Sequence, residues 1–146
     1  MYETVQVLHS YWAYLTLLVL LLAGINALIG FSGNRDFQTK DLRISLFGLI
    51  FSHLQLLIGL ILYFVSPRFA LWGELGMGGI MKDSVNRLYL VEHPTVNIIA
   101  LILITVGWSL HKKQETSKRK FGKIAVFYLI GLVLILSRIP WDSWLG

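Results

Sequence analysis

Long runs of apolar residues, separated by short polar segments, dominate the chain. They lie at about residues 8–30, 44–65, 88–110 and 124–139. A helix that crosses a bilayer needs about 20 predominantly apolar residues, and the first three runs meet that length. The fourth is shorter, but it is followed by tryptophans, which are favoured at the membrane interface. We therefore predict an all-α fold, a single-domain integral membrane bundle of four helices, with the lipid bilayer as its main partner.

The basic residues between these runs predict how the bundle is oriented. Most of them follow the first and third runs: Arg35, Lys40, Arg43, Lys112, Lys113, Lys118, Arg119, Lys120 and Lys123. The opposite side keeps Arg68, Lys82, Arg87 and, at the end of the fourth run, Arg138. Cytoplasmic loops of membrane proteins are enriched in Lys and Arg, so the first set is expected to be cytoplasmic. Both termini and residues 66–87 are then expected on the outer, periplasmic side.

Composition narrows the classes of function. The 146 residues are 55% hydrophobic and 14% charged, against about a quarter charged in soluble domains. The chain has no cysteine, which excludes disulfides, iron–sulfur clusters and thiolate metal sites. The net charge of +5 comes from residues that flank the helices, so we expect no nucleic acid partner. No Ser-His-Asp arrangement, phosphate loop or HExxH motif occurs, which favours an electron carrier or accessory subunit over a stand-alone enzyme.

Ionisable residues inside the apolar runs are the candidate functional residues, because such groups are costly in a bilayer. His9, His53 and His93 fall in three different predicted helices. We expect His9 and His93 at similar depth near the outer surface, and His53 closer to the middle of the membrane. Arg138 lies at the outer end of the fourth run, where it can bind an anionic group such as a haem propionate or pair with Glu92.

Pro94 directly follows His93 and predicts a backbone irregularity there. If the helix begins with Asp83 as its N-cap, the proline falls inside the helix, frees the carbonyl of Leu90 and kinks the helix beside the histidine. Alternatively, the helix begins near His93 and the proline lies in its first turn. Either arrangement places an irregular backbone next to a candidate ligand.

Two segments at the ends of the predicted helices are expected to be irregular or solvated. The glycine-rich stretch Gly73 to Gly79 is expected to form a loop that covers the outer site. His111 is followed by two lysines, so we expect it to be solvated at the cytoplasmic surface.

Histidines that project inward from different helices of a bundle are typical of a metal or haem site. Two histidine ligands fill both axial positions of a haem iron and favour electron transfer. Without a CxxCH motif, the haem would be a non-covalent haem b, with His9 competing with His53 or His93 as ligand. Met77 and Met81 near outward histidines permit copper as an alternative.

Other interpretations of the same residues remain open. Electrons would pass to or from quinone or a respiratory complex. The chain would otherwise be an accessory factor that delivers haem or copper to an oxidase, or a structural subunit without a cofactor. Small residues along the predicted helices favour close packing, either within the bundle or between subunits of a homo-oligomer.

Four stretches carry a resemblance to a known family. They are LHSYW (8–12), FSHLQLLIGLILYFVSP (51–67), VEHP (91–94) and RIPW (138–141). Over nearly the whole chain they resemble small bacterial four-span proteins labelled cytochrome b-like, which implies haem and the bacterial inner membrane. The HLQLLIG segment, with a histidine in the next span, is also similar to half of a haem A synthase. That resemblance implies His53 and His93 as axial ligands.

Overall fold

The computed structural model describes residues 1–145, and this part of the chain is helical without any strand. The elements are α1 (Tyr2–Ser32), α2 (Thr39–Val65), η1 (Pro67–Ala70), α3 (Leu71–Lys82), α4 (Ser84–Arg87), η2 (Leu88–Glu92), α5 (His93–Lys112), α6 (Ser117–Ser137) and α7 (Trp141–Leu145). Four helical segments are long and apolar enough to cross a membrane: Tyr2–Ser32, Thr39–Val65, Ser84–Lys112 and Ser117–Ser137. The predicted all-α fold is confirmed, and so is the presence of four helices with the length and composition of membrane spans.

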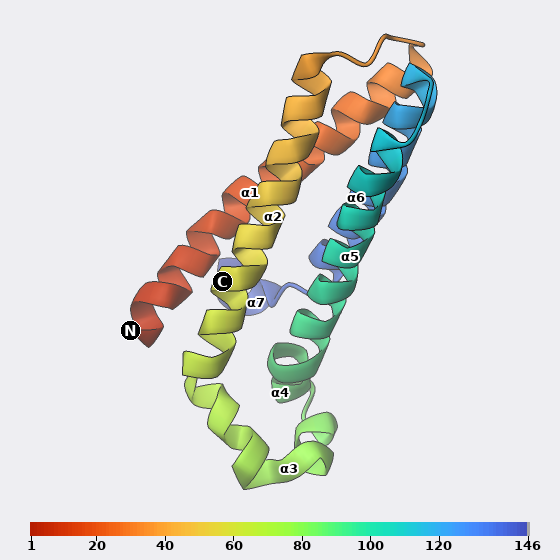
Figure 1. The fold of residues 1–146 in the computed structure, drawn as a ribbon. Coiled ribbons are helices and arrows are strands. Elements are labelled where there is room, and N and C mark those ends of the chain that lie inside the picture. The colour runs from red at the N-terminus through yellow and green to blue at the C-terminus, as the bar shows by residue number, and fades with distance from the viewer. Residues whose placement is uncertain (146) are drawn as a thin grey trace.

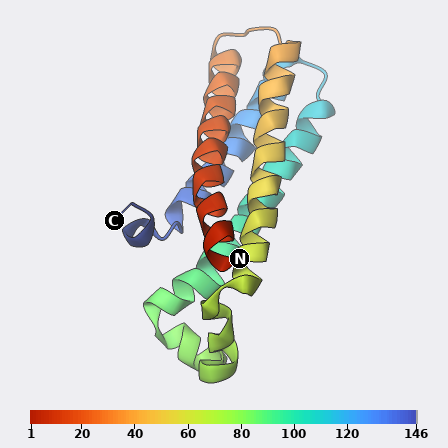
Figure 2. The same ribbon diagram turned by 90° about the vertical axis from the view of Figure 1, so that its left-hand side faces the viewer.

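The four long helices run alternately up and down (Figures 1 and 2). Helix α1 packs along α2 and α6, and α5 packs along α6, whereas α2 and α5 touch over a shorter stretch. The α1–α2 and α5–α6 connections lie together at one end of the bundle, which we call the two-loop end. Helices α3 and α4 project from the opposite end, which we call the α3 end (Figure 1).

The well-packed core occupies the part of the bundle nearer the two-loop end. Its buried members are Leu20, Ala23, Ala27, Ile104, Phe121, Ile124, Ala125, Tyr128 and Leu132. Glycines let the helices approach here, since a Cβ on Gly107 would lie 2.4 Å from the Cβ of Phe127. Such small residues are the usual means of close helix packing in membrane proteins. The outside of the bundle is strongly apolar, with leucine, isoleucine or valine side chains exposed on every long helix.

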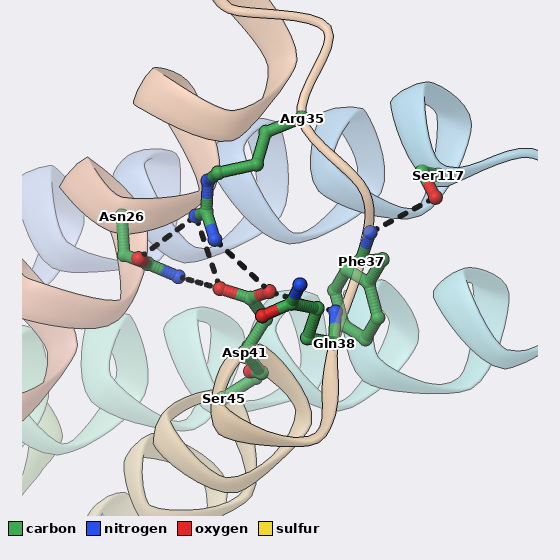
Figure 3. A network of polar contacts seen from close by, with 7 residues as sticks. All are labelled: Asn26, Arg35, Phe37, Gln38, Asp41, Ser45 and Ser117. Carbon is green, nitrogen blue, oxygen red and sulfur yellow. Dashed lines mark hydrogen bonds and ion pairs between the residues drawn. The ribbon is translucent and has the colours of Figure 1, made fainter.

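A polar network holds the α1–α2 connection at the two-loop end (Figure 3). The Asp41 side chain is fully buried and accepts hydrogen bonds from the Asn26 amide at 2.9 Å and from the Arg35 guanidinium at 3.0 and 3.2 Å. The backbone N–H of Gln38 also donates to it, at 2.8 Å, and this completes an N-terminal cap of α2. This buried ion pair was not among the features predicted from the sequence.

His111 differs from the expectation of a solvated residue. Only 1% of its surface is exposed, and its ring packs against Phe37 and Trp108, with centroids 5.5 and 4.6 Å apart. The physical reason is that α5 continues to Lys112 with His111 on its inner face, so the α1–α2 connection covers the ring. The prediction for His111 was wrong.

The stretch Gly73 to Gly79 is likewise not a loop. It lies within α3, whose helical path is broken at Gly76 by a φ of +67°, a conformation that glycine adopts without strain. None of its residues lines the cavity described below. The expected cover over the site is therefore absent from this stretch, and the neighbouring η1 contributes to the cavity instead through Arg68.

Candidate functional site

His9 of α1 and His93 of α5 lie close together in the part of the bundle nearer the α3 end. Their ring centroids are 6.2 Å apart and their planes are nearly perpendicular, at 85°. Both rings line a cavity of about 390 Å³ to which α1, α2, α5, α6 and the segments at the α3 end all contribute. The two histidines were expected at similar depth near the outer surface, and the structure brings their rings together at one level of the bundle.

The backbone around His93 is irregular in the way that Pro94 predicts. Asp83 caps the helix, with its carboxylate accepting hydrogen bonds from the backbone N–H groups of Val85 and Asn86, and the helical path continues through a π-helical turn, Leu88–Glu92, into α5. Pro94 therefore lies inside the helix rather than at its start. The Tyr63 hydroxyl donates a 2.9 Å hydrogen bond to the carbonyl of Leu90. π-Helical turns are rare in proteins, and those that occur often lie at functional sites.

The His93 ring is held by the backbone at the end of α6. Its Nδ1 atom lies 2.8 Å from the carbonyl oxygen of Arg138. A carbonyl oxygen only accepts hydrogen bonds, so Nδ1 carries the proton and Nε2 keeps a free lone pair. The side-chain nitrogen of Asn97, one turn along α5, lies 3.2 Å from the same Nδ1 atom, but both nitrogens then carry N–H groups, so this contact is not a hydrogen bond in that tautomer. The ring is thus oriented with its Nε2 atom available as a ligand or proton acceptor.

His9 packs against α2 at Gly59. A Cβ at this glycine would lie 3.1 Å from His9 Cε1, so any larger side chain would displace the ring. The Gln55 amide donates to the backbone carbonyl of His9 at 3.0 Å. Two buried polar atoms of this contact, His9 Nδ1 and Gln55 Oε1, have no hydrogen-bond partner. An unpaired buried polar atom costs roughly 1–3 kcal/mol. A ligand that forms a hydrogen bond or a metal bond with either atom would remove that cost, so this wall of the cavity favours a polar ligand group.

His53 does not join the other two histidines. It is exposed on the outside of α2 and does not line the cavity. Its Nδ1 atom lies 2.7 Å from the Leu49 carbonyl, and its Nε2 atom lies 3.4 Å from Thr105 Oγ1. Its neighbour Ser52 is fully buried, and one residue along a helix turns the side chain by about 100°. The structure therefore does not bring His53 and His93 together as an axial pair.

Arg138 contacts His93 through its backbone carbonyl and not through its guanidinium. The side chain is exposed, and its Nε atom lies 3.7 Å from Glu92 Oε1. Pairing with Glu92 was one of the two alternatives predicted for Arg138. Arg87 donates to the other oxygen of Glu92 at 2.8 Å. The Arg138 side chain does not line the cavity, so the structure offers no support for a propionate contact there.

Arg68 lines the cavity, and it was predicted only as a basic residue of the outer side, not as a residue of the site. Its guanidinium lies 4.0 Å from the centroid of the Tyr89 ring and donates to Asn86 Oδ1 at 3.0 Å. Tyr63, which accepts a hydrogen bond from the Trp72 indole at 2.9 Å, was not predicted as a site residue either. Ser52, Gln55, Gly59 and Tyr63 recur on α2 at intervals of three or four. This spacing indicates that they share one face of the helix, and that face lines the cavity.

Within residues 1–145, no group of three or more His, Cys, Asp or Glu side chains is placed to hold a metal ion. The site instead offers two histidines, an orphaned glutamine oxygen and one arginine around a largely apolar cavity. No protein-family model, curated protein or solved structure matches this chain.

Proposed function

We propose that this chain is a membrane-embedded cytochrome in which His9 and His93 are the axial ligands of one b-type haem. The observation that carries the proposal is their separation. A histidine nitrogen binds a metal at about 2 Å, so two imidazoles on opposite sides of one iron have ring centroids about 6 Å apart. The centroids of His9 and His93 are 6.2 Å apart.

The surroundings of His93 support the same assignment. Metal-ligating histidines almost always donate their other ring N–H to a carbonyl or carboxylate, which fixes the tautomer and the orientation of the ring. The carbonyl of Arg138 is such a partner. By comparison, His53 Nδ1 bonds within its own helix, and its ring does not face the cavity.

His9 and His93 would be the two protein residues that hold the haem, and a haem needs no third protein ligand. The cavity volume of about 390 Å³ falls within the roughly 300–1,000 Å³ of typical ligand sites. Apolar side chains such as Leu17, Leu101 and Ile135 form much of its wall and suit an apolar macrocycle. Copper chemistry has less support, since Met77 and Met81 are exposed on α3 and do not line the cavity.

Held by His9 and His93, a b-type haem would supply one-electron transfer. The chain's own part is to hold both imidazoles neutral and oriented, to keep the site apolar, and to place Arg68 at the cavity as a cation for an acidic group. Quinone or a respiratory complex is the partner class that fits a carrier embedded in a membrane.

The proposal includes an orientation in the bacterial inner membrane. The two-loop end carries the nine basic residues that follow the first and third apolar runs, so it is assigned to the cytoplasm. The α3 end, both chain termini and the cavity would then belong to the periplasmic side. Electron exchange would take place in that half of the membrane.

Absorption spectroscopy of the purified protein tests the assignment. We expect a Soret band and about one haem per chain. His9→Ala or His93→Ala should abolish the bis-histidine spectrum, whereas His53→Ala, the matched control, should leave it unchanged. A wild-type protein that is colourless and gains no Soret band on haem addition would reject the proposal and favour a cofactor-free structural subunit. Loss of the spectrum in His53→Ala alone would reject the ligand pair.

A further inference from the structure

A groove lies at the two-loop end, whereas His9 and His93 lie nearer the α3 end. Its volume is about 480 Å³, and it lies between the end of α1, the α5–α6 connection and the first half of α6. Two cations, Arg119 and Lys123, line it together with Phe31 and Phe127. The groove therefore combines positive charge with aromatic surface, and none of these residues belongs to the proposed haem site.

The shape of this groove depends on Gly122. A Cβ at this position would lie 3.4 Å from ring atoms of Phe31, so the glycine leaves the Phe31 ring open as a wall of the groove. The Lys118 amine lies 4.8 Å from the centroid of the same ring, and this adds a third cation at the edge. A larger residue at 122 would fill the groove without changing its charge.

The residues along one face of α6 change from basic to apolar with distance from the two-loop end. Arg119, Lys123, Val126, Ile130 and Val133 follow one another at intervals of three or four and so share a helical face. The three apolar members are about half exposed or more. This order, cations first and then an exposed aliphatic strip, parallels the headgroup and acyl chain of a lipid.

The two cations of the groove have no acidic partner among residues 1–145. Among residues 1–145, the ion pairs involve Arg35, Arg87 and Arg138 but neither Arg119 nor Lys123. Arg119 is exposed and Lys123 is partly buried. An arginine and a lysine one turn apart bind a phosphate well, because both supply charged N–H donors. Residues 1–145 thus leave both positive charges of the groove available to an external anion.

We infer that this groove binds one phospholipid whose headgroup carries a net negative charge. Its phosphate would lie against Arg119 and Lys123, and an acyl chain would follow Val126 and Ile130 along α6. Basic pockets between transmembrane helices on the cytoplasmic side are recognised sites for anionic headgroups. The inference requires that the helices span a membrane, but it does not depend on haem.

Native mass spectrometry of the detergent-purified protein tests this site. We expect phosphatidylglycerol to remain bound at one molecule per chain, and phosphatidylcholine with the same acyl chains to bind at least about tenfold more weakly. The double variant Arg119→Gln/Lys123→Gln should bind phosphatidylglycerol at least about tenfold more weakly than the wild type. Gly122→Leu, which fills the groove at constant charge, should also reduce binding.

The matched control is Lys112→Gln/Lys113→Gln, which removes two exposed cations at the same end but outside the groove. It should retain wild-type binding. Equal binding of the two lipids to the wild type would overturn the inference without any variant, so misfolding cannot obscure the result. Equal loss in the control and the groove variant would also overturn it, because net charge alone would then explain the binding. The Soret band tests the haem proposal separately.

Discussion

The hydroxyl of Tyr63 on α2 donates a 2.9 Å hydrogen bond to the carbonyl oxygen of Leu90. In an α-helix that carbonyl would bond the backbone nitrogen of residue 94, but Pro94 has no N–H to give. The tyrosine therefore satisfies a backbone group that the proline leaves free. It also accepts from the Trp72 indole, so one side chain connects α2, α3 and the irregular turn beside His93.

Tyr63→Phe tests this connection. The substitution keeps the ring but leaves the Leu90 carbonyl and the Trp72 N–H without this partner, so we expect a loss of about 1–3 kcal/mol in stability. Thermal unfolding in detergent, followed by circular dichroism, measures the loss. Tyr11→Phe is the control, since Tyr11 is 69% exposed. Equal melting temperatures for the two variants would show that the hydrogen bond contributes nothing to the fold.

Gly59→Ala tests whether contact with α2 positions His9. The new Cβ would lie 3.1 Å from His9 Cε1, which forces the ring a few tenths of an ångström away. If His9 is an axial ligand, haem content should fall several-fold, as measured by the Soret absorbance per chain. Gly73→Ala makes a suitable comparison, because a Cβ there meets nothing within 4 Å. An undiminished Soret band in Gly59→Ala would mean that the ring position is not critical.

The parts of this structure that sequence predicts are those with local causes. Apolar runs of sufficient length predict the four spans, Asp83 predicts a helix start, and Pro94 predicts a carbonyl without its usual donor. Each span depends only on its own run of residues, and the helix start and the free carbonyl depend on residues within about one turn. The helices themselves extend further than the apolar runs: α6 begins at Ser117, because hydropathy detects the apolar part and not the charged first turns.

The orientation of helix faces was harder to predict. In α2, His53 and Ser52 are adjacent, yet one is exposed and the other buried. A helix that is apolar on all sides has no polar face to mark its outside, so sequence leaves its rotation undetermined. His111 shows the same difficulty at the edge of a span. The buried Asp41 did have a local indication, since Gln38 and Asp41 have the spacing of a capping box.

Arg35→Ala tests the network around Asp41. The change leaves a fully buried carboxylate with only the Asn26 amide and the Gln38 N–H as donors, and removal of one partner of a buried ion pair costs up to about 3–5 kcal/mol. Because Arg35 is itself partly exposed, we expect the lower part of that range or less. Thermal unfolding measures it, with Arg43→Ala, an exposed arginine one turn into α2, as control. If Arg35→Ala,Asp41→Asn is no more stable than Arg35→Ala, the buried charge is not the cause.

Cysteine labelling tests the proposed orientation, and the absence of native cysteine makes each introduced thiol unique. Lys113→Cys lies at the two-loop end, and Met77→Cys replaces an exposed residue of α3. In intact cells, a thiol reagent that crosses the outer but not the inner membrane should label Met77→Cys only. After the inner membrane is permeabilised, it should label both variants. Labelling of Lys113→Cys alone in intact cells would reverse the assignment, and the cavity with His9 and His93 would then face the cytoplasm.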